Sequence, residues 1–185
     1  MKSPLHACVL LLVGLVCLLG ATACASSRAP ALAPDDVRAL GRGSKLTVVF
    51  FFSAHCPCQA AHDPRLRALH ARYFSRGVKF VAVDAEATAS TDVDDREAAA
   101  RHYPFPIVSD PEGKLADALG AEFATFSVVI DEGGHVLYRG GIDSDRSHLT
   151  EDAQPWLDDA LAALLLGNTP KIVESKALGC ALQRK

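Results

Sequence analysis

The chain has 185 residues, a formal net charge of −3 and a hydrophobic content of 49%. This length is sufficient for one domain with a proper hydrophobic core. The slightly acidic balance and the lack of a basic run argue against binding to nucleic acid or to an anionic membrane surface.

Residues 1–23 are typical of a signal peptide. One basic residue, Lys2, precedes an apolar run over 7–20, and small residues at Ala21 and Ala23 suit export cleavage. The run is shorter than the roughly 20 apolar residues of a membrane span. The stretch that ends in Cys24 resembles the lipobox of bacterial lipoproteins, which implies that Cys24 becomes the lipidated mature N-terminus. A plain exported protein and an uncleaved anchor are the alternatives, and all three place the domain outside the cytoplasm.

Three further segments follow the signal. Residues 24–44 begin rich in Ala, Pro and Ser and predict a tether, with one short helix over Asp35–Leu40. The folded domain is expected over 45–167. Residues 168–185 are expected to form a C-terminal tail that carries Cys180.

A continuous apolar run over 47–52, rich in β-branched and aromatic residues, predicts a strand buried on both faces. Cys56, Pro57 and Cys58 follow, and then a helical pattern begins. A thiol at this junction lies near the free N–H groups and the positive end of the helix, which stabilise a thiolate. Two cysteines around a proline at such a place favour redox or thiolate chemistry over an inert buried cysteine.

The remaining chain alternates strands and helices, which predicts parallel strands with a closing antiparallel hairpin. Thr91 and Asp94 are predicted to cap one of these helices. The expected elements, in order, are a helix after Cys58 that ends by Gly77, a strand over Val78–Asp84, a helix from Thr91 to about His102, a short strand at Ile107–Val108, a short helix over Lys114–Leu119, a strand over Phe126–Ile130, a hairpin strand over His135–Arg139, and a final helix marked by Leu157, Leu161, Leu164 and Leu165.

This order of elements, with a thiol after the first strand, resembles the thioredoxin-like superfamily. It is most similar to the redoxin branch, which holds TlpA-like exported thiol–disulfide oxidoreductases and peroxiredoxins. The resemblance implies an α/β thioredoxin-like fold, with a central mixed sheet flanked by helices and a redoxin-type insert between the second strand and the closing hairpin. The stretches that carry it are Phe50–Pro57, Val78–Asp84, Phe105–Gly113, Phe126–Asp131, Gly134–Asp143 and Ala177–Cys180.

The resemblance also implies roles for three cysteines. Cys56 is the attacking thiol, Cys58 is its natural resolving partner, and Cys180 is a second candidate for resolving or relaying, because the tail is long enough to reach the site. Three thiols is an odd number, which argues against a purely structural disulfide framework in an oxidising compartment.

Three departures from the family pattern fall on the candidate substrate-binding residues. His55 replaces the tryptophan that often precedes the first cysteine, and it adds positive charge when protonated. Pro57 is the single residue between the cysteines, where the family usually has two, so a Cys56–Cys58 bond requires a bend there. Thr125 or its neighbour stands where the family has the cis-proline that docks substrates.

The function expected from these features is an exported thiol–disulfide oxidoreductase, held by its lipid at Cys24 and facing the periplasm of a bacterial cell envelope. Its partners would be cysteines of envelope proteins and an unidentified thiol–disulfide electron donor or acceptor, with no cofactor and no resident metal. The alternatives are a peroxiredoxin-like thiol peroxidase, in which Ser53 assists the attacking thiol, a copper-binding redoxin-like chaperone that uses Cys56, Cys58 and a histidine, and a degenerate structural module. His62 and His70 are expected to be surface residues.

Overall fold

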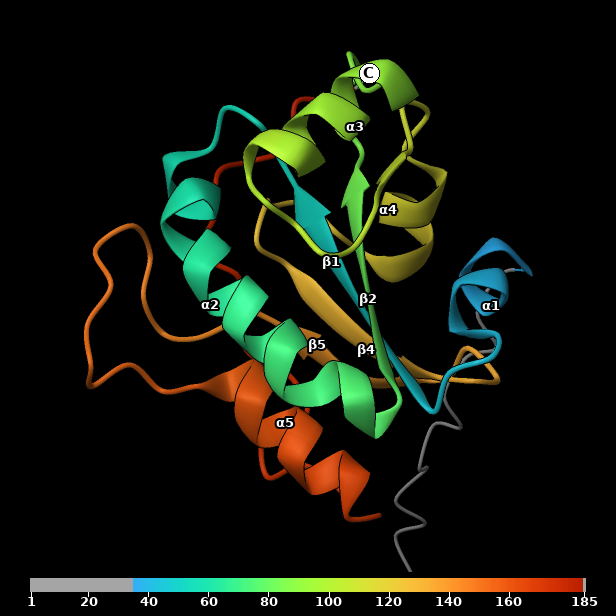
Figure 1. Ribbon diagram of the computed structural model, residues 1–185, viewed down its shortest axis with the longest axis vertical. Helices are drawn as coiled ribbons and strands as arrows, with labels where there is room; N and C mark the ends of the chain where they lie inside the picture. Colours follow the sequence, from blue (N-terminus) through green and yellow to red (C-terminus); the bar gives the residue numbers. More distant parts are fainter. Residues whose placement is uncertain (1–34, 185) are drawn as a thin grey trace, which may run out of the picture.

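A computed structural model describes residues 35–184 (Figure 1). The predicted signal peptide, the predicted lipidation site Cys24 and most of the predicted tether lie outside the described residues. The observed elements are α1 (Asp35–Gly41), β1 (Leu46–Phe52), α2 (Pro57–Tyr73), a 3-10 turn (Phe74–Arg76), β2 (Val78–Asp84), α3 (Thr91–Ala100), β3 (Ile107–Ser109), α4 (Lys114–Leu119), β4 (Ser127–Asp131), β5 (Val136–Gly140) and α5 (Trp156–Leu165).

The five strands form one mixed sheet in the order β3-β2-β1-β4-β5. β1 pairs in parallel with β2, and β2 pairs in parallel with β3. β4 and β5 form the closing antiparallel hairpin, and β4 pairs antiparallel with β1. The mixed sheet and its flanking helices confirm the predicted fold class. The carboxyl end of the central strand β1 opens on the loop that carries Cys56.

Helices cover both faces of the sheet, with α2 and α5 on one face and α1 and α4 on the other (Figure 1). All seven residues of β1 are buried. Because successive strand side chains point to opposite faces, Phe50 and Phe52 pack in the cluster under α2 and α5, whereas Phe51 packs in the cluster on the other face. This two-sided burial explains why β1 reads as an unbroken apolar run.

The insert between β2 and the hairpin consists of α3, β3 and α4. The prediction that Thr91 and Asp94 form a capping pair is wrong. Ser90 is the N-cap residue of α3, and no side chain caps it. The side chain of Asp94 is fully buried and accepts a hydrogen bond from Ser109 in β3 instead, so it ties the helix to the sheet.

The tail returns to the sheet rather than trailing away. After α5 it runs alongside the edge strand β5, where Ser175 N–H donates to the Arg139 carbonyl at 3.0 Å. It then brings Cys180 next to the start of α2, and further on the Gln183 carbonyl accepts a hydrogen bond from Ala87 N–H in the loop after β2. The tail therefore belongs to the same folded unit as the predicted domain over 45–167.

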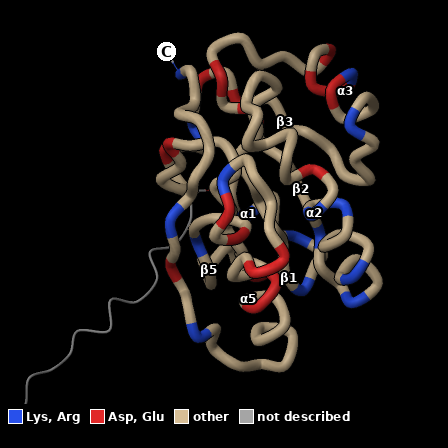
Figure 2. The backbone as a smooth tube through the Cα atoms, turned by 90° about the vertical axis from the view of Figure 1, so that its left-hand side faces the viewer, with Lys and Arg blue, Asp and Glu red and all other residues tan. Residues whose placement is uncertain are grey.

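Charged residues of both signs are distributed over the described part of the chain, with basic residues prominent along α2 (Figure 2). Between residues 35 and 184, no helix is long and apolar enough to cross a membrane.

Candidate active site

The site lies where β1 gives way to α2. Cys56 is the N-cap residue of α2, with extended backbone angles (φ −86°, ψ 113°), and Pro57 is the first helical residue. A proline fits this position because its missing N–H would have no partner inside the helix. The first helical hydrogen bond runs from Ala60 N–H to the Cys56 carbonyl at 3.1 Å. The thiol of Cys56 is therefore held beside the free N–H groups of the first helical turn.

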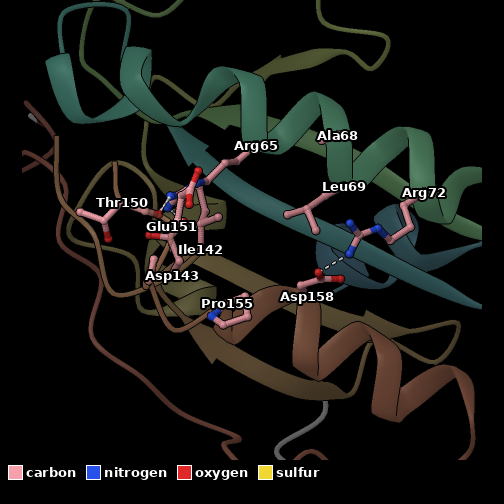
Figure 3. Close-up of a pocket in the computed structure, with 11 residues that line it drawn as sticks. Arg65, Ala68, Leu69, Arg72, Ile142, Asp143, Thr150, Glu151, Pro155 and Asp158 are labelled. Carbon is pink, nitrogen blue, oxygen red and sulfur yellow. Dashed lines mark hydrogen bonds and ion pairs between the residues drawn. The ribbon is translucent and has the colours of Figure 1, made fainter. Parts of the chain in front are cut away.

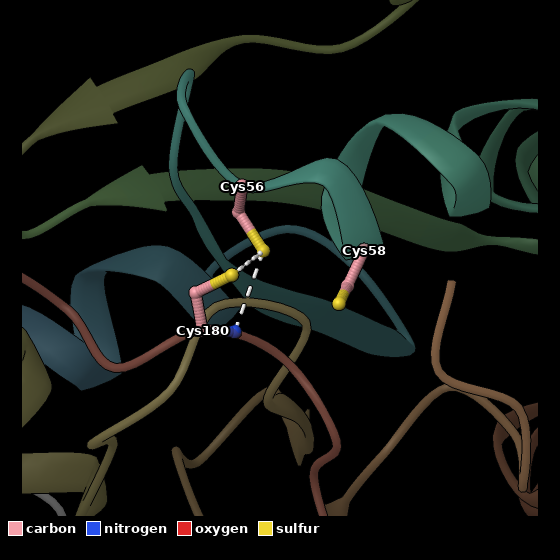
Figure 4. Close-up of side chains that lie close together, drawn as sticks. All are labelled: Cys56, Cys58 and Cys180. Atoms are coloured by element: carbon pink, nitrogen blue, oxygen red, sulfur yellow. Dashed lines mark hydrogen bonds between the residues drawn. The ribbon is translucent and has the colours of Figure 1, made fainter.

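Three sulfur atoms meet at this junction (Figure 4). The Sγ atoms of Cys56 and Cys180 share a hydrogen bond at 2.8 Å, and all three Sγ atoms, including that of Cys58, lie within 4.8 Å of one another. All three are free thiols. Cys56 and Cys58 are buried and Cys180 is half-buried, although 124 residues separate Cys56 from Cys180. The tail thus completes a site that begins at the helix.

The pKa of the Cys56 thiol is lowered from its ordinary value. Burial alone would raise this pKa, but hydrogen bonds stabilise the thiolate more strongly. They come from the Cys180 side chain and from the backbone N–H groups of Gln59, Cys180 and Cys58. The bond from the Cys180 N–H to Cys56 Sγ measures 3.3 Å. Cys56 is therefore the sulfur of the three that the fold prepares as a nucleophile.

The pKa of Cys180 moves in the opposite direction, to about 12. Its hydrogen bond with Cys56 raises it most, followed by burial and by the negative charge of the Cys56 thiolate. These opposite directions favour the thiolate at Cys56 and the protonated thiol at Cys180. This assigns unequal roles to a pair of residues of the same type.

Of the three predicted substrate-binding residues, two lie beside the thiols on the surface. His55 and Pro57 are exposed. Thr125 is buried, has a left-handed backbone conformation (φ 68°) and donates its N–H to the Phe51 carbonyl at 2.8 Å. The described residues contain no cis peptide bond. The backbone next to Thr125 is already paired, because Ala124 N–H donates to a carbonyl of the tail.

A buried carboxylate cluster near the same sheet end was not predicted. Asp84 ends β2, and Glu86 follows it with its N–H donated to Asp84 Oδ1 at 2.9 Å. Ser53 Oγ donates to Glu86 Oε1 at 2.7 Å. Burial, together with the nearby negative charge of Asp94, raises the pKa of Asp84 to about 7. Acids at the end of a strand or in the first turn of a helix are normally solvated, so their positions in the sequence gave no signal of this burial.

His62 was expected on the surface, and this expectation is wrong. Its side chain is buried on α2, with Nδ1 2.7 Å from the Cys58 carbonyl and Nε2 3.1 Å from Asp143 Oδ1. Burial lowers the pKa of His62. The hydrogen bonds to Asp143 and to the Cys58 carbonyl raise this pKa by more than burial lowers it, so the net shift is upward. Only the imidazolium can donate to both acceptors at once. His62 therefore links the first turn of α2 to the loop after β5.

A separate cavity of about 480 Å³ lies between α2 and the loop that leads into α5 (Figure 3). Arg65 and Arg72 line it, but each is paired with an acid, Arg65 with Asp143 at 2.5 Å and Arg72 with Asp158. None of the three cysteines lines this cavity. The thiol chemistry and this cavity are therefore separate features.

Two comparisons with known proteins bear on the chain as a whole. A protein-family model described as Redoxin matches residues 27–153. The match includes β1, the start of α2, the insert and the hairpin, whereas Cys180 lies beyond it. A search of curated protein sequences gave no match.

Solved structures share the fold over most of the chain. An uncharacterized conserved protein of Geobacillus kaustophilus aligns with a TM-score of 0.70 at 26% identity, covering 79% of this chain and 80% of that one. A hypothetical protein of Sinorhizobium meliloti aligns with a TM-score of 0.70 at 23% identity, covering 82% and 84%. A secreted disulfide oxidoreductase of Mycobacterium tuberculosis, homologous to E. coli DsbE, aligns with a TM-score of 0.52 at 18% identity, covering 68% and 85%. These likenesses show a thioredoxin-like fold.

Proposed function

The chain belongs to the redoxin family, and from this premise we propose that it exchanges disulfides with protein cysteines outside the cytoplasm, with Cys56 as the attacking thiolate and Cys180 as the resolving thiol. The observation that carries the proposal is the 2.8 Å contact between the two Sγ atoms, one of which has a lowered pKa. A disulfide bond is about 2.05 Å long, so closing it requires only a small approach of the two sulfurs.

The shared proton sets the order of the two steps. The Cys56 thiolate attacks a client disulfide, forms a mixed disulfide with one client sulfur and releases the other as a thiolate. Cys56 then has no thiolate to accept the hydrogen bond from Cys180, so the largest cause of the raised pKa of Cys180 is gone, together with the negative charge of Cys56. Cys180 can now lose its proton, attack the Cys56 sulfur and release the reduced client. A dithiol donor returns the Cys56–Cys180 bond to two thiols, and an oxidising partner would run the same steps in reverse.

Cys58 is the less favourable resolving partner. It lies two residues after Cys56, within the first turn of α2. Residues i and i+2 at the start of a regular helix do not direct their side chains toward each other, so a Cys56–Cys58 bond would distort that turn. Cys58 instead remains as a free third thiol beside the reactive pair.

Location and anchoring are part of the same proposal. The signal peptide over 1–23, the lipid anchor at Cys24 and the tether that leads from it to α1 together describe an oxidoreductase held at a bacterial envelope membrane. The secreted oxidoreductase of M. tuberculosis supports this location by sharing the fold. Its clients would be cysteines of envelope proteins.

The peroxidase alternative is less well supported. It requires the Ser53 hydroxyl to assist the attacking thiol, but Ser53 Oγ donates to the carboxylate of Glu86 at 2.7 Å. The chain also lacks the proline that peroxiredoxins usually place before that serine or threonine. Exchange between thiols and disulfides does not need either group.

Binding of a soft metal ion is the second candidate function. The specific observation is the group of three Sγ atoms within 4.8 Å of one another, in apolar surroundings. Three sulfur ligands suit Cu(I). The third ligand would be Cys180 rather than the histidine expected from the sequence. Disulfide formation between Cys56 and Cys180 would remove two of the three ligands, so the two functions exclude each other at any moment.

The first experiment is to map the disulfides of the oxidised protein by mass spectrometry with differential thiol labelling. We expect a Cys56–Cys180 bond that dithiothreitol reverses. The matched control is Cys58→Ser, which should form the same bond. If the thiols are still free after oxidation and react only slowly with an alkylating reagent, the proposal is overturned. One bound copper ion per chain would then favour the metal-binding alternative. Rapid consumption of hydrogen peroxide would favour the peroxidase.

A further inference from the structure

The tail lies against the loop before β4 as an added extended segment. Ala124 N–H donates to the Cys180 carbonyl at 2.8 Å, and Leu182 N–H donates to the Glu122 carbonyl at 2.9 Å. The pairing is antiparallel. Residues 122–124 therefore form a backbone edge that binds a cysteine-containing segment in a defined register.

The same contact closes access to the nucleophile. Cys56 is only 1% exposed, and Cys180 supplies both the sulfur at 2.8 Å and the backbone N–H at 3.3 Å. A client sulfur must come within bonding distance of Cys56 Sγ, and Cys180 already occupies that position. The tail must therefore leave before a client can react with Cys56.

In the docked tail, the positions from Gly179 to Leu182 differ in which side chains they can accept. At Gly179 a Cβ atom would lie 1.7 Å from the carbonyl oxygen of Ala124, so any other residue would clash with the backbone there. Ala181 is exposed, so its position sets no requirement. Leu182 is 8% exposed and packs in the core cluster on the face of α1 and α4. The segment that fits reads Gly, Cys, any residue, then an aliphatic residue.

We propose that residues 122–124 are the client-binding edge, that Gly179–Leu182 occupy this edge between turnovers, and that the preferred clients carry the same pattern of glycine, cysteine, any residue and an aliphatic residue. The inference rests on the proposed exchange function and names the substrate class of that site. When the tail returns, its backbone replaces that of the client on the edge, and Cys180 displaces the client sulfur from Cys56. One movement thus completes the disulfide and releases the product.

The test uses the full chain with Cys180→Ser, which lacks the proposed resolving thiol. Three peptides contain Gly-Cys-Ala-Leu, Val-Cys-Ala-Leu or Gly-Cys-Ala-Asp, each with its cysteine activated as a disulfide to thionitrobenzoate. Attack by the Cys56 thiolate forms the Cys56–peptide disulfide, breaks the peptide–thionitrobenzoate bond and releases one thionitrobenzoate anion. The rate of release is measured, and mass spectrometry locates the adduct on Cys56. Ellman's reagent, which has no peptide backbone, gives the intrinsic reactivity of Cys56.

We expect the Gly-Cys-Ala-Leu peptide to react at least tenfold faster than the Val-Cys-Ala-Leu peptide and several-fold faster than the Gly-Cys-Ala-Asp peptide. A second variant, Gly179→Val together with Cys180→Ser, should undock the tail and leave the edge intact. At a pH above the pKa of Cys56, where differences in acidity no longer matter, it should react several-fold faster with every reagent and keep the same order of peptides.

Equal rates for the three peptides, with Cys56 reactive toward Ellman's reagent, would overturn the client pattern and leave the exchange function standing. Unchanged rates in the Gly179→Val variant would overturn the role of the tail in covering Cys56. If Cys56 fails to react with Ellman's reagent in both variants, the exchange function itself falls, and this inference falls with it.

Discussion

At the scale of single residues, the site depends on an inequality between two thiols in contact. Cys56 receives hydrogen bonds from three backbone N–H groups and from Cys180, whereas Cys180 faces the negative charge of Cys56. The backbone N–H of Cys180 therefore helps to stabilise Cys56 as a thiolate. A cysteine at a helix start is common, but a second thiol fixed against it by the C-terminal tail is the arrangement on which we base the proposed redox role of the pair.

The Cys180→Ala variant tests this inequality. Losing the side-chain hydrogen bond removes one of the causes that lower the pKa of Cys56, so that pKa should rise. At neutral pH a smaller fraction of Cys56 is then thiolate, although the site is more open. The measurement is the rate of iodoacetamide alkylation at Cys56 as a function of pH, in which the midpoint reports the pKa and the plateau reports access.

The control for this profile is Cys58→Ala, which keeps the backbone N–H that supports Cys56. Its midpoint should stay near that of the unmodified protein. A midpoint that does not move in Cys180→Ala would show that the tail thiol leaves the acidity of Cys56 unchanged.

At the scale of elements, three buried acidic side chains lie together at the carboxyl end of β2, beside the loop that carries Cys56. Asp84, Glu86 and Asp94 are each at most 6% exposed. Their mutual repulsion and burial hold Asp84 protonated until about pH 7. The same contacts tie β2 to α3 and to the loop after β1, so this end of the sheet is sensitive to pH.

Asp84→Asn should remove that sensitivity. The folded-state pKa of Asp84, about 7, lies above its ordinary value of 3.8. Its stabilising contribution is therefore present below the ordinary value and is lost as pH rises toward 7, by up to about 1.4 kcal/mol per pH unit. Above pH 7 both states are ionised and the loss levels off. Urea unfolding at several pH values should show the variant gaining at least about 1 kcal/mol relative to the unmodified protein between pH 5 and 8.

A parallel pH dependence in the two proteins would contradict this assignment. Asp152→Asn is the matched control, because Asp152 is exposed and lies outside the cluster. Its unfolding free energy should follow that of the unmodified protein across the same range.

At the scale of the whole molecule, the tail joins parts of the fold that lie far apart. It pairs with Arg139 at the edge strand β5, with residues 122–124 before β4, and through the Gln183 carbonyl with the N–H of Ala87 after β2. Its last described residue, Arg184, is paired with Asp117. The tail therefore covers both a free strand edge and the nucleophile.

A chain that ends after Gly167 should keep the sheet and lose the tail segment that covers Cys56. Removing buried Leu182 alone should lower the free energy of unfolding by about 2 kcal/mol. Cys56 should alkylate at least tenfold faster at a pH above the pKa of the thiol, where differences in acidity no longer matter. Far-ultraviolet circular dichroism checks that the sheet and helices remain, and unchanged alkylation would contradict the covering role.

Much of the fold could be predicted from the chain because its signals are local. The apolar run of β1, the turn at Gly133 and Gly134, and the helical spacing of Leu157 and Leu161 each depend on neighbours within a few residues. The alternation of these elements then predicted the mixed sheet. Asp94 and His62 were misjudged because each finds its partner in another element, Asp94 at Ser109 in β3 and His62 at Asp143 after β5, which local spacing does not report.

By itself, the sequence determined that a cysteine stands where the central strand gives way to a helix, since the strand run and Pro57 fix that junction locally, and it predicted that this thiol is reactive. Only the tertiary structure decided which second thiol contacts Cys56. Cys58 is close along the chain and Cys180 is distant, yet the antiparallel pairing of the tail places Cys180 Sγ 2.8 Å from Cys56 Sγ. The physical reason is that the contact between the sulfurs depends on where the backbone hydrogen bonds of the tail are made, and the partners of Cys180 and Leu182, Ala124 and Glu122, lie far earlier in the sequence.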